Sequence, residues 1–201
     1  MCEHLGRLSR SSIIVLLALG ATFAGFVLAS NAERLRGDDS DVTPSVAARP
    51  QIAELDWNEA YGEGEQILFT VDRLEVTESG WRAQVGIDNH TEAGWELAPG
   101  ATPDGTFGLQ LFETGDKAEL DERNRAGTLP AVRAATRYAP ELPRILEPGR
   151  SWHGTISAPG PLLANSYARV MFGTLFAVGK PPEDMSDRVV WITDHRYQLK
   201  P

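Results

Sequence analysis

The sequence predicts an all-β protein, an antiparallel β-sandwich of about seven strands, preceded by a single N-terminal transmembrane helix and a disordered linker. Three observations carry this prediction. Apolar residues alternate with polar ones over much of the chain after Glu65, which is the period of a strand. No strong helical pattern separates successive strands, as it would in a parallel α/β protein. The N-terminal stretch 11–32 is uncharged and long enough to span a membrane.

The N-terminal stretch contains a dense apolar run over residues 13–29. A helix of about 20 residues rises about 30 Å, which matches the hydrocarbon core of a bilayer. A cleaved signal peptide has a shorter apolar run of about 7–15 residues, so we favour a retained signal anchor. Cleavage stays an alternative, because the small residues at 27–29 and 30–32 fit a cleavage site. The mature protein would then be a secreted β-sandwich.

The residues that flank the apolar run predict the topology. Arg7 and Arg10 lie on the short N-terminal side, which we therefore expect to stay in the cytoplasm. This gives a cytoplasmic tail at residues 1–10, a single-pass helix at 11–32 in the cell membrane and an extracytoplasmic C-terminal domain. The lipid bilayer is thus an expected partner. Residues 33–60 are polar and carry an acidic cluster and two prolines, so we expect a flexible linker there.

Charge and cysteine content argue against several classes of function. The net charge of −9 argues against nucleic acid as a partner, because nucleic acid binding needs a basic surface. The only cysteine, Cys2, precedes the apolar run, so the expected extracytoplasmic domain has neither a disulfide nor a catalytic thiolate. Its histidines, His90, His153 and His195, are widely spaced, and no hydrolase motif or phosphate-binding loop is present. We expect no enzymatic activity, no cofactor and no metal site.

The clearest predicted structure in the domain is a β-hairpin. The apolar positions of 67–71 and 74–76 have opposite parity, so we expect a β-bulge near Asp72–Arg73, where one extra residue would flip every later side chain. A turn at 77–80 then leads into a second alternating strand over 81–87.

Further strands are expected along the rest of the domain, which we place at residues 61–201. They lie at 95–97, 107–111, 152–158, 167–176 and 189–199. Five tryptophans can supply much of the core, since each buries about 150–250 Å².

Three short motifs carry a resemblance to a known class of domain. The sequence reads LEVTESGW at 74–81, NHT at 89–91 and LEPGRSWHG at 146–154. Together they resemble bacterial membrane-tethered immunoglobulin-like β-sandwich domains of unknown function, over residues 65–199. The resemblance implies an immunoglobulin-like fold outside the membrane and brings no catalytic residue. The inter-sheet cysteine pair of antibody domains is absent.

One connection, residues 114–150, is far longer than the usual about 4–6 residues between strands. Its first part, 116–125, alternates in charge and predicts a short helix. The segment carries an excess of arginine over acidic residues in its second part, in an otherwise acidic protein. The arginines are Arg123, Arg125, Arg133, Arg137, Arg144 and Arg150. We therefore expect a long inserted loop with a positive surface.

Arginine binds carboxylate and phosphate groups through paired hydrogen bonds, so this loop is the candidate partner-binding site. The candidate residues are Arg133, Arg137, Tyr138 and Arg144. The expected partner is an unidentified envelope protein, a wall polymer or an anionic lipid. In the alternative interpretation, these arginines pair with the domain's own acids and the loop only caps one end of the sandwich.

The leading functional hypothesis is a non-enzymatic, membrane-anchored extracytoplasmic module that binds another envelope component through this loop. In a second hypothesis the protein is an accessory subunit of a membrane protein complex, and its transmembrane helix carries the specificity. A hydrolase or metal enzyme is the third alternative.

Overall fold

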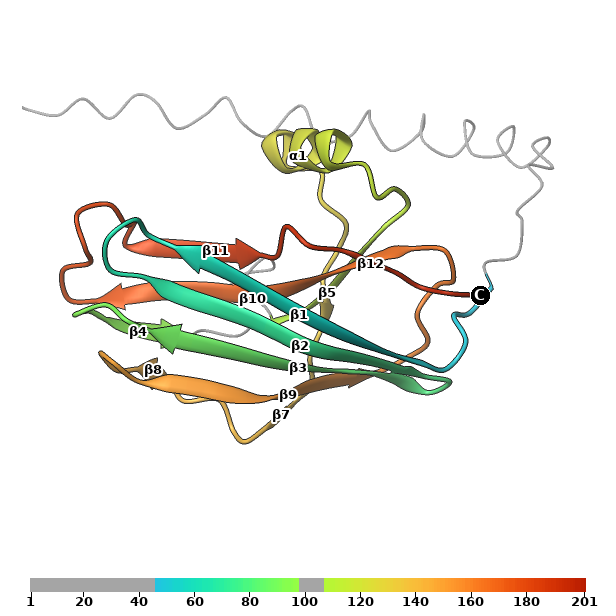
Figure 1. Ribbon diagram of the computed structural model, residues 1–201, viewed down its shortest axis with the longest axis horizontal. Coiled ribbons are helices and arrows are strands. Elements are labelled where there is room, and N and C mark those ends of the chain that lie inside the picture. Colours follow the sequence, from blue (N-terminus) through green and yellow to red (C-terminus); the bar gives the residue numbers. More distant parts are fainter. Residues whose placement is uncertain (1–45, 98–106) are drawn as a thin grey trace, which may run out of the picture. The chain divides into compact units, whose positions relative to one another are not determined.

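The computed structural model describes residues 46–97 and 107–201, which form two antiparallel β-sheets and one short helix (Figure 1). This confirms the prediction of an all-β, antiparallel protein. The predicted cytoplasmic tail at 1–10 and transmembrane helix at 11–32 lie outside the described residues. Within the described ranges, no helix is long and apolar enough to cross a bilayer.

The first sheet has five strands in the order β1-β2-β3-β9-β7. These are β1 (Gln51–Tyr61), β2 (Ile67–Thr77), β3 (Gly80–Asn89), β9 (Ser151–Pro159) and β7 (Arg137–Ala139). Strands β2 and β3 form the predicted hairpin, in which Thr77 pairs with Gly80. Their register shifts between Val71 and Arg73, which confirms the β-bulge expected from the change of parity.

The second sheet is organised around β10 (Tyr167–Val178). The first half of β10 pairs with β5 (Phe107–Phe112) and its second half with β4 (Gly94–Leu97), so these two strands follow each other along one edge. The opposite edge of β10 pairs with β11 (Arg188–Ile192) and β12 (Tyr197–Gln198). Two short strands complete the sheet, β6 (Arg133–Ala134) on β5 and β8 (Ile145–Leu146) on β4.

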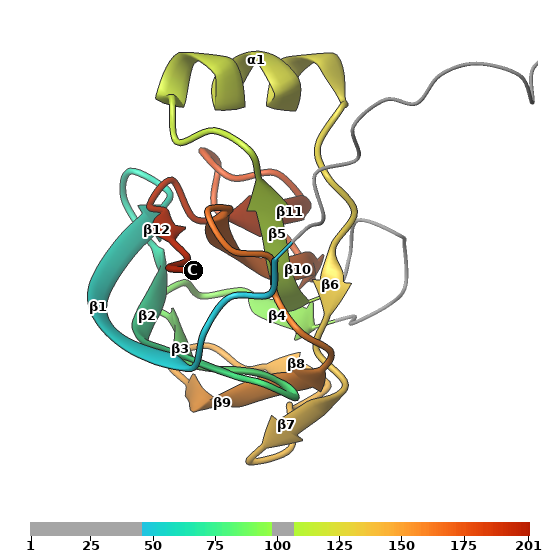
Figure 2. The same ribbon diagram turned by 90° about the vertical axis from the view of Figure 1, so that its right-hand side faces the viewer.

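The two sheets enclose one hydrophobic core, and Figure 2 shows them as two layers. Phe69 of β2 meets Phe172 of β10 with ring centroids 5.0 Å apart, and Phe107 of β5 meets Trp152 of β9 at 6.3 Å. All five tryptophans lie in this core or pack against it, as expected. The edge-to-face geometry of these ring pairs adds to the free energy gained from their burial.

The described residues contain twelve strands instead of about seven. The additional strands are β1, β6, β7, β8 and β12. Apart from β1, these have only two or three residues, too few to show a period in the sequence. The expected last strand at 189–199 is divided into β11 and β12, because the chain between them turns toward β1. There the Glu59 carboxylate accepts hydrogen bonds from the backbone N–H groups of Asp194 and His195.

The predicted flexible linker at 33–60 is wrong for its last ten residues, which belong to β1. This strand pairs with β2 from Gln51 to Tyr61 and buries Ala53 and Trp57. The composition of the segment is polar because one face of β1 is exposed to solvent, so composition alone does not reveal the strand.

The predicted inserted loop at 114–150 is also more regular than expected. It begins with α1 (Lys117–Ala126), which confirms the predicted helix; the side chain of Asp116 caps it by accepting a hydrogen bond from the N–H of Glu119. The segment then adds β6 to the second sheet, β7 to the first and β8 to the second. We call residues 114–150 the crossing segment, because it connects the edges of both sheets.

Candidate functional site

The crossing segment holds all four predicted partner-binding residues, but it places them at three different edges. Arg133 lies on β6 at the edge of the second sheet. Arg137 and Tyr138 lie on β7 at the edge of the first sheet, and Arg144 directly precedes β8. The four residues therefore present separate contacts, and each has its own surroundings.

Arg133 and Arg144 are engaged by the chain itself. A guanidinium nitrogen of Arg133 donates a hydrogen bond to the carbonyl oxygen of Pro161 at 3.0 Å. Arg144 forms an ion pair with Glu96, with 3.0 Å between Nε and Oε1. Exposed pairs of this kind contribute about 0–1 kcal/mol and can exchange with solvent. For these two arginines, the contacts match the alternative interpretation, in which the arginines bind the domain's own polar groups.

Tyr138 anchors β7 to the core. Its half-buried ring packs edge-to-face against Phe107, with centroids 5.8 Å apart. Burial raises the pKa of the Tyr138 phenol, because the charged phenolate is disfavoured away from water. Its neighbour Arg137 points to the other face, since successive side chains of a strand alternate. Tyr138 thus fixes the backbone that carries Arg137.

Arg137 differs from the other two arginines. Its side chain is exposed, and within the described part of the chain it has no hydrogen bond or ion pair. The backbone of Arg137 pairs with Ser157 of β9. Its guanidinium lines a groove of about 420 Å³ between β7, β9 and the turn that joins β2 to β3. Figure 2 shows β7 and β9 together at the lower edge of the molecule.

The groove is lined by two arginines and four residues with hydroxyl groups, together with Gly80, Trp81, Ala158 and Pro159. Two guanidinium groups, of Arg82 and Arg137, and four hydroxyl groups contribute to its wall. The hydroxyl groups belong to Thr77, Ser79, Thr136 and Ser157. Arg82 is bound to Glu75 by an ion pair of 2.7 Å, and this hydrogen bond lowers the pKa of Glu75. The free cation of the groove is therefore Arg137.

The wall of the groove has little freedom to move. A Cβ atom at Gly80 would lie 2.5 Å from the carbonyl oxygen of Ala158, so the hairpin turn lies directly against β9. The N–H of Gly160 also donates to the carbonyl of Ser79 at 2.9 Å. The groove is thus formed by tightly packed backbone on two sides and is present without a ligand.

Two of the motifs behind the family resemblance form a structural contact. The buried Asn89 side chain donates to the carbonyls of Ala93 at 2.8 Å and Leu146 at 3.1 Å. Its Oδ1 accepts from the Thr91 backbone at 3.0 Å, and the Thr91 hydroxyl in turn accepts from the Trp95 indole at 3.0 Å. These residues connect the β3–β4 turn to β8. The Asn89 amide is therefore part of the core structure.

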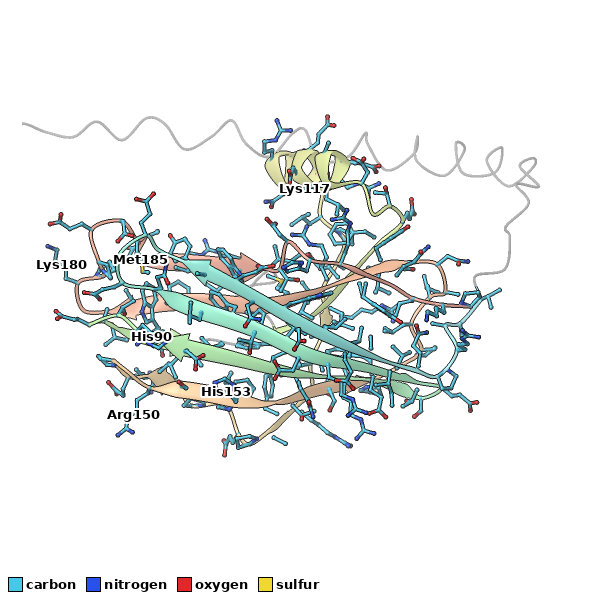
Figure 3. The ribbon with its side chains drawn as sticks, in the orientation of Figure 1. His90, Lys117, Arg150, His153, Lys180 and Met185 are labelled. Carbon is cyan, nitrogen blue, oxygen red and sulfur yellow. The ribbon has the colours of Figure 1, made fainter. Side chains whose placement is uncertain are left out.

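The three histidines lie in different surroundings and do not come together (Figure 3 labels two of them). His153 Nε2 lies 2.7 Å from Asp88 Oδ1, and His195 stacks on Trp57 at 5.6 Å, whereas His90 is exposed. Burial raises the pKa of Asp88, but hydrogen bonds from Ser151 and His153 outweigh it, so the net shift is downward. Among residues 46–97 and 107–201, no three His, Cys, Asp or Glu residues are arranged to hold a metal ion.

A buried arginine, Arg169 of β10, is the main ionic feature that sequence patterns missed. Its guanidinium donates to the carbonyl of Thr193 and to Asp194 at 3.3 Å. Burial lowers the pKa of Arg169, and the negative charges of Asp194 and Glu59 oppose this shift. Lys117, at the start of α1 and labelled in Figure 3, forms an ion pair with Asp194 at 3.6 Å. The cluster fastens the helix and the β11–β12 turn to the second sheet, which is a structural role.

Comparisons with protein-family models, with curated proteins and with solved structures found no match for this chain. The functional proposal below therefore depends on the residues and the geometry described above.

Proposed function

We propose that this protein is a non-enzymatic, membrane-anchored extracytoplasmic module that binds another component of the cell envelope through its crossing segment. The observation that carries the proposal is Arg137. It is an exposed cation on a strand that Tyr138 holds in place, beside a groove lined with hydroxyl groups. A preformed, positively charged groove suits recognition of an anionic group.

We further propose that the domain is immunoglobulin-like. The order β2-β3-β9-β7 in one sheet and β11-β10-β4/β5 in the other supports this, because it corresponds to the orders ABED and GFC of constant-type immunoglobulin domains. In this correspondence β1 is an additional edge strand. Domains of this type present loops and sheet edges to partners on a rigid core, which fits a binding module.

The membrane anchor is supported by the uncharged stretch at 11–32 and the arginines that precede it. The proposal assigns the residues between this stretch and the β domain the role of the predicted linker. In this arrangement, the crossing segment acts on the outer side of the membrane. The cell envelope there offers anionic lipids, wall polymers and acidic proteins as partners.

The proposal is tested by binding of the purified full chain to isolated cell envelopes and to vesicles containing phosphatidylglycerol. We expect Arg137→Ser to weaken envelope binding, because it removes the free cation. Arg144→Ser is the matched control; it removes the same charge, but from a side chain already paired with Glu96. Unchanged envelope binding of a variant with Arg133, Arg137 and Arg144 all changed to Ser would contradict the proposal.

A further inference from the structure

The groove beside Arg137 has a lining that selects among anionic partners. Its two guanidinium groups and four hydroxyl groups come from the β2–β3 hairpin, β7 and β9, and from the residue before β7. None of the described residues that line it carries a carboxylate. Two carboxylates lie outside this lining but near it: Glu75, which holds Arg82, and Glu78, which stands between the lining residues Thr77 and Ser79. The lining therefore favours an oxyanion, because it contains two guanidinium groups and no carboxylate.

The hydroxyl groups add a second requirement. The Thr77 hydroxyl donates to the carbonyl of Gly80 at 3.1 Å and lies 3.4 Å from the Ser79 hydroxyl, and the Thr136 hydroxyl donates to the carbonyl of Ser157 at 3.5 Å. Their oxygens can still accept a hydrogen bond, so the wall matches a ligand that carries donors such as hydroxyl groups. Ser157 and Thr136 lie on the β7–β9 side, and Thr77 and Ser79 lie on the hairpin side. A ligand that fills the groove would meet hydroxyls on both sides and the Arg137 guanidinium at the edge.

We propose that this groove binds the acidic group of a hydroxyl-rich polymer, that is, a sugar or polyol chain that carries carboxylate or phosphate groups. This inference rests on the proposed function and names its ligand class. Arg137 binds the oxyanion through its paired N–H donors, and the hydroxyl groups bind neighbouring hydroxyls of the polymer. A volume of about 420 Å³ lies within the range of small-ligand sites, about 300–1,000 Å³.

An acidic peptide is the competing ligand, because its backbone N–H groups can also donate to the hydroxyl oxygens of the groove. It lacks the hydroxyl groups of a polyol, and triglutamate is therefore included in the test as the acidic peptide.

Isothermal titration calorimetry of the full chain, purified in detergent, tests the inference. The probes are trigalacturonate, which carries carboxylates, and tri(glycerol phosphate), which carries phosphates; maltotriose is the neutral control and triglutamate the acidic peptide. We expect at least one acidic polyol to bind, and the two probes distinguish carboxylate from phosphate as the recognised group. Maltotriose and triglutamate are expected to bind at least about tenfold more weakly.

Two variants with the same change of charge localise the site. Arg137→Gln is expected to weaken binding of the acidic polyol at least about tenfold, the loss of one hydrogen-bonded charge. Arg150→Gln is the control, because Arg150 is exposed in the same segment but precedes β9, about 20 Å along the strand from Ser157. Figure 3 labels Arg150 at the far end of β9. The Arg150→Gln variant is expected to bind the acidic polyol with the same affinity as the unchanged protein.

Two results would overturn the inference. In the first, neither acidic polyol binds to the protein. In the second, the Arg137→Gln and Arg150→Gln variants bind the acidic polyol equally well. In both cases the groove is not the binding site. Equal affinity for triglutamate would instead assign the groove to an acidic protein. If Arg137→Ser still weakens binding to whole envelopes after any of these results, the proposed function stands and only the ligand class is wrong.

Discussion

Asn89 illustrates how one residue holds two distant turns. Changing Asn89 to Ala removes the side-chain donor to the carbonyl of Leu146 and the acceptor of the Thr91 N–H, both in a buried place. We expect the free energy of unfolding to fall by about 2–4 kcal/mol, because each buried, unsatisfied group costs about 1–3 kcal/mol. Urea unfolding measures this. His90→Ala, exposed in the same turn, should change stability by less than about 0.5 kcal/mol, and equal effects would contradict the role of Asn89.

Asp88 gives a prediction about pH. Its pKa is lower in the folded protein than in the unfolded chain, so its contribution to stability is present above pH about 4 and is lost as the pH falls further. We expect Asp88→Asn to be less stable than the unchanged protein at neutral pH and to approach it in stability near pH 3. Thermal unfolding across this range measures the difference.

The matched control for Asp88 is Asp72→Asn, whose exposed side chain lies at the β-bulge of β2. It removes a carboxylate without removing the contact of Asp88 with His153, so a change on acidification that both variants share is not specific to Asp88. A gap between Asp88→Asn and the unchanged protein that does not shrink on acidification would show that the hydrogen bonds of Asp88 do not stabilise the fold through its charge.

At the scale of elements, the β2–β3 hairpin and β9 form one wall through direct backbone contact. Gly80→Ala places a methyl group 2.5 Å from the carbonyl oxygen of Ala158, so the hairpin must shift. We expect a loss of about 1–3 kcal/mol in the free energy of unfolding, together with weaker binding in the groove. Gly64→Ala is the control, because its added methyl group has open space. If both variants are equally stable, the contact is looser than described.

The crossing segment contains one element that the sequence predicts, its helix, and three short strands that it does not. Its helix was predictable because the charge pattern over 116–125 is local. Strands β6, β7 and β8 were not, because each has only two or three residues and forms by pairing with a strand that is distant in sequence. The segment was therefore predicted as a loop, although it adds strands to both sheets.

Strand β1 was missed for a related reason. Its inward positions include Gln51 and Glu59, and these polar residues hide the alternation that would have predicted a strand. Glu59 is acceptable there because it accepts hydrogen bonds from the Trp191 indole and the Asp194 backbone. Only the fold supplies these donors, so the sequence alone could not show them. The bulge of β2, in contrast, changes the parity of neighbouring residues and was predicted correctly.

For the whole molecule, the sequence indicated the region of the candidate site and four residues in it, Arg133, Arg137, Tyr138 and Arg144, but not which of the arginines the chain itself engages. The excess of arginine in the crossing segment is visible in the sequence. The partners of Arg133 and Arg144 are Pro161 and Glu96, which lie far away in sequence and become neighbours only through folding. The groove beside Arg137 likewise requires four strands, β2, β3, β7 and β9, to come together. Composition thus indicated a basic surface, and the fold distinguishes Arg137, which has no ion pair among the described residues, from Arg133 and Arg144, which the chain engages.

The account depends most on the side of the membrane that the β domain occupies. Cys2 is the only cysteine, so a single new cysteine can be labelled selectively. Glu183 is 95% exposed, and Glu183→Cys in a Cys2→Ser background reports on the domain. We predict that a membrane-impermeant maleimide labels this variant in intact cells, after permeabilisation of any outer membrane, and labels Cys2 of the unchanged protein only after lysis. Labelling of Cys2 but not of the Glu183→Cys variant in intact cells would contradict the account.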